Sequence, residues 1–356
     1  MSLIQSPTTQ GEGTHLHTIS IVIPVYQGET TLPSVIDELL PYTEPSRTAR
    51  GTEFQVSEIL LVHDNGPDAS DDTMRALAEA HPVVRPVWLS RNFGQHAATL
   101  AGMASTGGDW IVTMDEDGQH DPKFIADMLD TALTQQASLV YSMARNPPPH
   151  GFVRNLASVG AKRVLSSASG LKNAKDFQSF RLMLGSIGRS VAAYAGPNIY
   201  LDVALGWVTK DVATCPIDLR EEGDRPSGYN YKSLFGHFWR MFLTSGTRGL
   251  RAVSLLGVVA AIAGLVLTVV LVVAKLFFEP SLPSGWPSLM VALLIIGGAI
   301  LISLGMIAEY IGVNVNMAMG KPLYLIVPDP AAGPLGRARA QSGPQGGVVQ
   351  PARRDG

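Results

Sequence analysis

The chain has 356 residues, a formal net charge of −3 and 46% hydrophobic residues. This length accommodates two domains, or one domain with appendages. The charge balance provides no overall positive field of the kind that attracts nucleic acid, so we expect no nucleic-acid partner. The single cysteine, Cys215, excludes a disulfide framework and a cysteine-based metal site.

A polar leader is followed by an alternation of strand-like and helix-like segments. Residues 1–17 lack the apolar core of a signal peptide and are expected to be a disordered leader. The predicted strands are 18–25, 58–63, 83–89, 110–114 and 139–142, and the predicted helices between them are 31–40, 70–80, 95–105 and 122–135. This alternation predicts an α/β fold with a mostly parallel sheet and right-handed crossovers.

Two carboxylates, Asp115 and Asp117, directly follow the apolar run 110–114. Alternate side chains of extended backbone share a face, and Gly118 allows the chain to turn after them. Open α/β sheets bind ligands at the carboxyl ends of their strands. The pair therefore predicts a site for a hard divalent cation, Mg²⁺ or Mn²⁺, that also holds a diphosphate. An acidic turn that only caps the next helix is the alternative interpretation.

Polar residues also follow the other predicted strands, at Tyr26, Asp64 and Arg91-Asn92. Parallel strands end at the same edge of a sheet, so we expect these residues to lie on one rim with Asp115. That rim is the usual place for a nucleotide in such folds.

The last third of the chain carries two uncharged runs, 252–274 and 286–308. Each is long enough to cross a hydrocarbon core, for which about 20 residues suffice. The short segment 277–285 contains prolines and a glycine, which predicts a transmembrane hairpin. The preceding aromatic and basic stretch, 233–251, is typical of an amphipathic helix at a membrane surface, with a buried core helix as the competing interpretation.

Most basic residues that flank the two runs lie outside the hairpin loop, at Lys232, Arg240, Arg248, Arg251 and, after the second run, Lys321, while the loop side has only Lys275. The positive-inside rule then places the first domain and both termini in the cytoplasm, on the inner or plasma membrane. The tail, 325–356, is rich in proline, glycine, alanine and arginine and is expected to be disordered.

Five motifs carry a family resemblance: Ile23-Pro24-Val25-Tyr26, Leu89-Ser90-Arg91-Asn92-Phe93-Gly94, Met114 to Pro122, Asp176-Phe177 with Phe180-Arg181-Leu182, and Arg225 to Tyr229 with Tyr231-Lys232. In this order, and followed by two predicted spans, they resemble the polyprenyl-phosphate glycosyltransferases. These form a membrane branch of glycosyltransferase family 2 that includes dolichol-phosphate mannose synthase. The resemblance runs from about Thr18 to Tyr324 and is closest to the bacterial two-span members.

The resemblance implies a GT-A type catalytic domain at 18–232, a juxtamembrane region at 233–251, and a transmembrane hairpin with its C-terminal segment at 252–324. The implied reaction transfers one sugar from a UDP- or GDP-linked donor to a polyprenyl phosphate at the cytoplasmic membrane face, with inversion. The implied partners are the donor, the lipid acceptor and the bilayer. Small residues in the second run, Gly297-Gly298, leave a homo-oligomer open.

The resemblance also assigns roles to residues. The catalytic candidates are Asp176 and Asp117. The nucleotide-sugar contacts are Pro24, Tyr26, Glu29, Asp64, Arg91, Asn92 and Asp115. The phosphate-binding candidates are Arg181, Arg225 and Lys232, and the metal ligands are Asp115 and Asp117. His120, beside the metal loop, is a further candidate ligand, although such a histidine more often makes a hydrogen bond.

The chain departs from the family pattern in the nucleotide pocket. The usual Asp-Asp-Gly-Ser is His63-Asp64-Asn65-Gly66 here, and the usual Tyr-Asn-Glu is Tyr26-Gln27-Gly28. The base of the donor therefore stays open. Two alternatives to single-sugar transfer also stay open. One is a processive polysaccharide synthase, because Gln178 to Leu182 is similar to the Gln-x-x-Arg-Trp motif of such enzymes, and the other is a catalytically inactive membrane-anchored scaffold.

Overall fold

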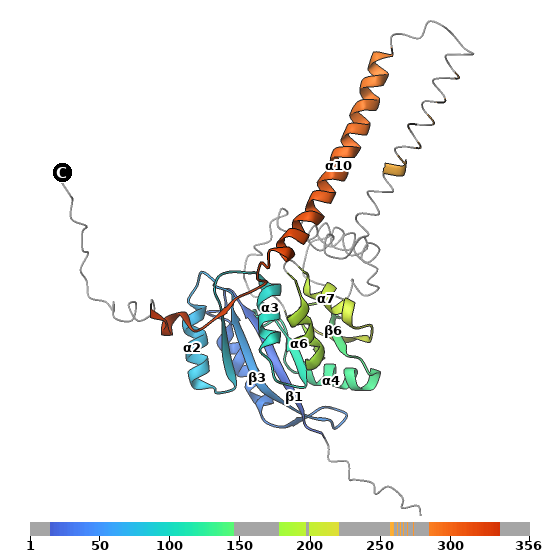
Figure 1. The fold of residues 1–356 in the computed structure, drawn as a ribbon. Helices are drawn as coiled ribbons and strands as arrows, with labels where there is room; N and C mark the ends of the chain where they lie inside the picture. Colours follow the sequence, from blue (N-terminus) through green and yellow to red (C-terminus); the bar gives the residue numbers. More distant parts are fainter. Residues whose placement is uncertain are drawn as a thin grey trace, which may run out of the picture. The chain divides into compact units, whose positions relative to one another are not determined.

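The computed structural model describes residues 15–145, 178–196, 199–220 and 285–334, with isolated helical positions between 257 and 273. Figure 1 shows the ribbon coloured along the sequence. The residue contacts divide the chain into two compact units. Unit 1 contains Met1–Asp130, Ser179–Ala192 and Tyr324–Gly356, and unit 2 contains Thr131–Gln178 and Ala193–Leu323.

Unit 1 is built on a mixed sheet whose central strands are parallel. β1 (His17–Val25), β3 (Glu53–His63), β4 (Val84–Leu89) and β5 (Trp110–Thr113) run in the order β5-β1-β3-β4. Three short strands pair antiparallel with them: β2 (Ser46–Arg47) with β3, β7 (Arg181–Leu184) with β5, and β9 (Ile326–Val327) with β4. The predicted α/β fold with a mostly parallel sheet is confirmed.

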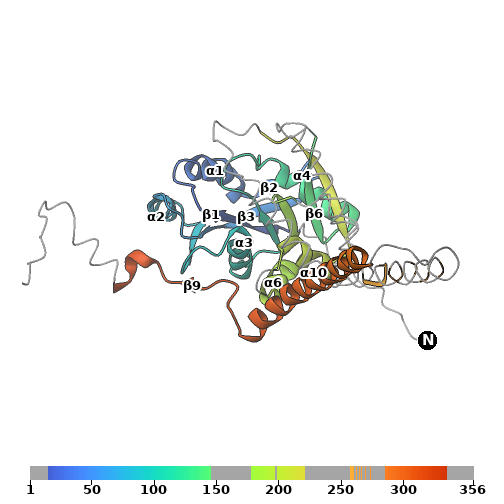
Figure 2. The ribbon, with the colours of Figure 1, turned by 90° about the horizontal axis from the view of Figure 1, so that it is seen from above.

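Helices of unit 1 cover both faces of this sheet. α1 (Leu32–Leu39) with the short helix η1 (Leu40–Thr43) connects β1 to β3, and α2 (Ser70–Ala80) connects β3 to β4. Figure 2 shows α1 and α2 on one side of β1 and β3, and α3 (Gln95–Ala104) on the other. The direction of strand addition reverses after β4, so right-handed crossovers require this change of face. The gap between β1 and β5 is therefore the topological switch point.

The core of unit 1 explains why these segments form these elements. Ile19, Ile21, Val22 and Ile23 of β1 are fully buried, as expected for a parallel strand with both faces covered. Each such side chain contributes about 1.5–3 kcal/mol through burial. α3 lies close to the sheet at Gly102, where an added Cβ would come within 2.4 Å of Val22.

Unit 2 contains the parallel pair β6 (Leu139–Ala144) and β8 (Val212–Ile217), with α7 (Leu201–Val208). The hydroxyl of Tyr141 in β6 donates a buried hydrogen bond of 2.9 Å to Asp202 of α7. Two further helices, α4 (Phe124–Gln135) and α6 (Gly185–Tyr194), begin in unit 1 and end in unit 2. Neither α7 nor β2 is among the elements that the sequence pattern predicts.

The longest helix of unit 2 is α10 (Trp286–Ala318), with 33 residues. Many of its large apolar side chains are exposed, among them Leu289, Leu293, Ile300 and Leu301. Among the residues that the structure describes, no helix satisfies both the length and the apolarity that a membrane span requires. The predicted transmembrane hairpin is therefore not shown. Most of its first run, 252–274, and all of the predicted amphipathic stretch, 233–251, lie outside the described residues.

The predicted disordered tail begins with ordered residues, which corrects the expectation for 325–334. β9 extends the sheet at the β4 edge, with Trp88 opposite Val327 and Leu89 opposite Ile326. Asp329 then accepts three hydrogen bonds from the Arg75 guanidinium and caps the short helix η3 (Pro330–Ala332). An open strand edge and a half-buried ion pair hold a segment whose composition alone indicated disorder. Residues 335–356 lie outside the described part.

Candidate active site

The carboxyl ends of β1, β3, β4 and β5 lie on one rim of unit 1. Tyr26 follows β1, Asp64 follows β3, Arg91-Asn92 follow β4, and the acidic triplet Asp115 to Asp117 follows β5. All four strands are parallel. The rim expected from the sequence therefore exists, and it flanks the switch point between β1 and β5.

Pro24 lies in a central strand, where proline is normally excluded because it lacks an N–H donor. Its placement is explained by the length of β5. Val22 O accepts the last bond from the β5 side, from Met114 N at 3.1 Å, while Val25 O bonds to Asp64 N on the β3 side at 2.8 Å. Since alternate residues of a parallel strand bond to alternate neighbours, Pro24 faces the side where β5 has already ended. The proline therefore lies where β1 extends past the end of β5.

Asp64 is buried, with 3% of its surface exposed, and both of its carboxylate oxygens hold the loop after β4. Oδ1 accepts from Phe93 N at 2.7 Å and Oδ2 accepts from Gly94 N at 2.8 Å. Burial raises the pKa of this carboxyl, although the two backbone hydrogen bonds and the nearby Arg91 oppose the rise. The family resemblance predicts that Asp64 contacts the nucleotide sugar. In the structure its visible contacts anchor the loop that carries Arg91 and Asn92.

Glu116 holds the loop after β1. Its Oε2 accepts from Tyr26 N and its Oε1 accepts from Gln27 N, each at 3.0 Å. These bonds join residues about 90 positions apart across the switch point. Space for them depends on Gly28, where an added Cβ would lie 2.7 Å from Glu116.

Asp115 is held by side-chain donors from two different segments. Gln95 Nε2, at the start of α3, donates to Oδ1 at 2.6 Å, and Ser179 Oγ, just before β7, donates to Oδ2 at 2.5 Å. Each carboxylate oxygen has two lone pairs, so each can accept a second interaction. The carboxylate is thus oriented by its neighbours and keeps the capacity to bind a cation.

His120 supports the backbone of the acidic triplet. Its Nδ1 accepts from Asp115 N at 3.1 Å, and its ring stacks on Phe180 with centroids 4.9 Å apart. Nε2 lies 4.0 Å from Asp115 Oδ2. His120 is buried, and these contacts are those of a hydrogen-bonding support.

Asp117 is exposed, and its Oδ1 accepts from Gln119 N at 3.0 Å. The next residue, Gly118, has φ of +76°. This left-handed conformation costs glycine little and most other residues more. It turns the chain directly after the acidic triplet and leaves Asp117 on the solvent side of the rim.

The remaining predicted nucleotide contacts lie around the same rim. Arg91 and Asn92 are exposed, and the Arg91 guanidinium lies 4.0 Å from the centroid of the Phe93 ring. Tyr26 is 44% exposed. Glu29 accepts a hydrogen bond from Ala69 N at 3.2 Å, so it holds the backbone directly before α2.

Arg181 is buried in β7, opposite Thr113 of β5. Its Nε donates to Thr113 Oγ1 at 3.1 Å and to Ser179 O at 3.4 Å. To bind phosphate, the buried Arg181 guanidinium would also have to contact a phosphate group at the rim. The predicted catalytic Asp176 and the predicted phosphate ligands Arg225 and Lys232 lie outside the described residues.

His63 occupies the position where the family usually has its first aspartate. It is 7% exposed and packs edge-on against Trp88, with ring centroids 5.4 Å apart. Burial lowers its pKa, so the ring is neutral near pH 7, although Asp71 and Asp68 oppose the shift. Within the described part of the chain, its Nε2 has no hydrogen-bond partner.

Sequence reasoning missed three residues of this site: Glu116, Gln95 and Ser179. Glu116 carried a signal, because it alternates with Asp115 and Asp117 and so faces the opposite side of an extended segment. Gln95 and Ser179 carried no local signal, since their roles depend on contacts 20 and 64 residues away.

Comparison with known proteins shows which family the first half of the chain is similar to. Residues 20–183 match the model of glycosyl transferase family 2. The match covers a little under half of the chain, and the α/β fold with a mixed, mostly parallel sheet is of the GT-A type.

Two relatives match over most of their length. The chain is 28% identical to the undecaprenyl-phosphate 4-deoxy-4-formamido-L-arabinose transferase of Salmonella choleraesuis, over 86% of this chain and 92% of that protein. The Yersinia enterocolitica protein of the same name is also 28% identical, over 88% of this chain and 94% of its own length. The resemblance inferred from the motifs, to polyprenyl-phosphate glycosyltransferases of family 2, is confirmed.

Among solved structures, the chain resembles Mycobacterium tuberculosis glucosyl-3-phosphoglycerate synthase. The TM-score is 0.45 and the identity 21%, over 65% of this chain and 80% of that one. A structure of the same enzyme with Mn²⁺, UDP-glucose and phosphoglyceric acid matches with a TM-score of 0.45 and 20% identity, covering 65% and 79% of the two chains.

Proposed function

We propose that the protein transfers one sugar from a nucleotide sugar to a polyprenyl phosphate, with inversion at the anomeric carbon. The observation that carries the proposal is the position of Asp115 and Asp117, directly past β5 and beside the switch point between β1 and β5. The full-length similarity to two transferases named for undecaprenyl phosphate supports the choice of acceptor.

The donor set of this site fits a hard divalent cation, Mg²⁺ or Mn²⁺. Asp115 and Asp117 offer carboxylate oxygens, which such ions prefer over nitrogen or sulfur. Gln95 and Ser179 fix the direction of the Asp115 carboxylate and leave it lone pairs for a metal. Such an ion, when bound, neutralises charge on the departing nucleoside diphosphate.

Some residues around Asp115 and Asp117 can contact the donor, and others hold the loops of the rim in place. Tyr26, Arg91 and Asn92 are exposed at the rim, where they can contact the donor's nucleoside. Pro24 lies where β1 extends past the end of β5, and Asp64 anchors the Arg91-Asn92 loop on the same rim. Glu29 fixes the neighbouring loop through Ala69 N.

The acceptor needs little activation, because a lipid phosphate oxygen is already an anionic nucleophile. It attacks the anomeric carbon as the bond to the diphosphate oxygen breaks. We assign Asp176 to orienting or deprotonating the acceptor, and Arg181, Arg225 and Lys232 to the phosphate groups. Preorganised positive charge of this kind stabilises the departing diphosphate.

We further propose that the protein is anchored in the bacterial inner membrane by a hairpin of the two uncharged runs, 252–274 and 286–308, with the catalytic unit and both termini in the cytoplasm. The exposed apolar side chains of α10 support contact with lipid, since solvated helices rarely present such a surface. The asymmetry of basic residues supports the orientation. A membrane anchor would keep the acceptor's phosphate within reach of the rim.

A processive synthase is less favoured. Its motif resemblance depends on Gln178 to Leu182, and Leu182 replaces the tryptophan of that motif. In the structure Leu182 is fully buried in β7, where it contributes to the core.

The test is a transfer assay with undecaprenyl phosphate and a panel of radiolabelled UDP- and GDP-sugars, scored by label in the organic phase. We expect one labelled lipid product of inverted configuration, and loss of most activity in Asp115→Asn and Asp117→Asn. Asp37→Asn, which removes an exposed acid from α1, is the matched control and should retain activity. A ladder of products, or full turnover of both rim variants, would refute the proposal.

A further inference from the structure

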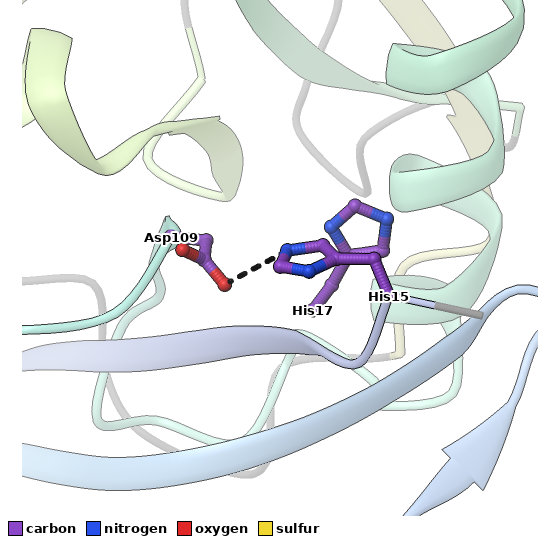
Figure 3. A group of neighbouring side chains, drawn as sticks. All are labelled: His15, His17 and Asp109. Atoms are coloured by element: carbon purple, nitrogen blue, oxygen red, sulfur yellow. Dashed lines mark ion pairs between the residues drawn. The ribbon is translucent and has the colours of Figure 1, made fainter. Parts of the chain in front are cut away.

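A second group of metal-binding side chains lies at the opposite end of β1 from the candidate active site. His15 precedes β1, His17 is its first residue, and Asp109 immediately precedes β5 (Figure 3). β1 has nine residues, so at about 3.3 Å per residue these groups lie roughly 26 Å along the strand from the rim. Catalysis at the rim therefore does not explain them.

The three side chains converge although they are far apart in sequence. One donor atom from each lies within 4.8 Å of the other two. His15 Nε2 is 3.6 Å from Asp109 Oδ2, and the two imidazole rings lie edge to face with centroids 4.7 Å apart. Ligands of one Zn²⁺, each about 2.0–2.2 Å from the ion, are separated by roughly 3–4 Å. A small rotation of the exposed His15 side chain would close that gap.

Asp109 is already oriented by its neighbours. Its Oδ2 accepts from Thr18 N at 3.0 Å and from Thr18 Oγ1 at 2.8 Å, and its own N–H donates to Thr18 Oγ1 at 3.0 Å. Its Oδ1 accepts no hydrogen bond from the residues that the structure describes. Supporting bonds of this kind hold metal ligands in place in known sites.

His17 is oriented by Trp110. The buried indole donates from Nε1 to His17 Nδ1 at 3.3 Å. A cation on Nδ1 would replace this bond. A cation on Nε2 would require the proton to sit on Nδ1, which then could not accept from the indole. Either mode of binding breaks the Trp110 hydrogen bond, so metal binding should change the fluorescence of Trp110.

We infer that His15, His17 and Asp109 form a surface site for a borderline divalent cation, Zn²⁺ in the first instance. Two imidazoles and one carboxylate match the ligand preference of zinc better than that of Mg²⁺, and water completes the coordination. The ion would join the start of β1 to the start of β5, and so stabilise the folded state by preferential binding. Nothing in this inference depends on the proposed transferase reaction.

The test uses the full chain in detergent, stripped of metal with chelator. It carries Asp115→Asn and Asp117→Asn, which remove the two proposed metal ligands at the rim. ZnCl₂ is titrated by calorimetry, and the melting temperature and Trp110 fluorescence are followed with and without Zn²⁺. We expect one bound ion, a rise in melting temperature, and at least tenfold weaker binding in His15→Ala and in Asp109→Asn. A Trp110→Phe variant should bind Zn²⁺ but lose the fluorescence change.

His81→Ala, which removes a histidine at the end of α2, is the matched control and should bind as the background does. His15 is exposed, so its replacement leaves the fold intact. Absence of stoichiometric binding in the background protein, or unchanged affinity in both ligand variants, would overturn the inference and leave a simple surface ion pair between His15 and Asp109.

Discussion

Replacing Asp64 with asparagine separates two roles that the sequence alone could not distinguish. The carboxylate accepts two backbone hydrogen bonds, from Phe93 N and Gly94 N, while almost fully buried. Asparagine keeps one acceptor oxygen and turns an NH₂ group toward the other amide. One charged hydrogen bond is lost and the second becomes neutral, which costs about 1–3 kcal/mol. Relief from burying the charge offsets part of this cost.

This free energy holds the Arg91-Asn92 loop, so its loss should appear first in the free protein. Hydrogen exchange at the Phe93 and Gly94 amides should accelerate by roughly 5- to 150-fold, the factor that corresponds to about 1–3 kcal/mol. Nucleotide binding, measured by calorimetry, should weaken within the same range. Weaker binding with unchanged exchange at these two amides would refute the anchoring role and restore Asp64 as a direct nucleotide contact.

Three further predictions follow from named contacts. Glu116→Gln should lower kcat/KM for the donor about tenfold, since one of two backbone acceptors is lost; unchanged kinetics would exclude a positioning role. Asp329→Asn should destabilise unit 1 by about 1–2 kcal/mol at neutral pH. Burial raises the pKa of Asp329, but the Arg75 hydrogen bonds outweigh it and lower the pKa below its ordinary 3.8. The difference in melting temperature should therefore shrink only as pH falls below about 3.8, and a constant difference would contradict this account. In a Cys215→Ser background, an impermeant thiol reagent outside the cell should label a cysteine at Ser281 but not one at Ser342; the reverse would contradict the proposed orientation.

The sequence predicted the parallel strands and the rim because both depend on local signals. Buried parallel strands are continuous apolar runs, and β1 and β5 both carry one. The rim follows from parallel strand direction alone. β9 could not be predicted in this way, because two residues carry no periodicity and their pairing depends on the free edge of β4. The Arg75–Asp329 ion pair spans 254 residues and has no local signature.

The residues of the site were predicted less completely than their location. An aspartate at a strand end can face a ligand, or it can accept hydrogen bonds from the next loop. Asp64 and Asp115 both follow parallel strands and look alike in sequence. Only the path of the loop after β4, which brings two N–H groups to Asp64, separates their environments.

That difference divides the rim acids into two groups by the donors they accept. Asp64 and Glu116 each bind two backbone amides of a neighbouring loop, and Glu29 binds one. A backbone amide cannot leave without moving its loop, so these acids fix the shape of the crevice. Asp115 is instead held by the side chains of Gln95 and Ser179, which can rotate as a ligand arrives. Removing charge from the first group should therefore alter loop protection in the free protein. Removing the charge of Asp115 should leave the hydrogen-exchange protection of the loops unchanged in the free protein. Its effect should appear only when the cation and the donor are bound.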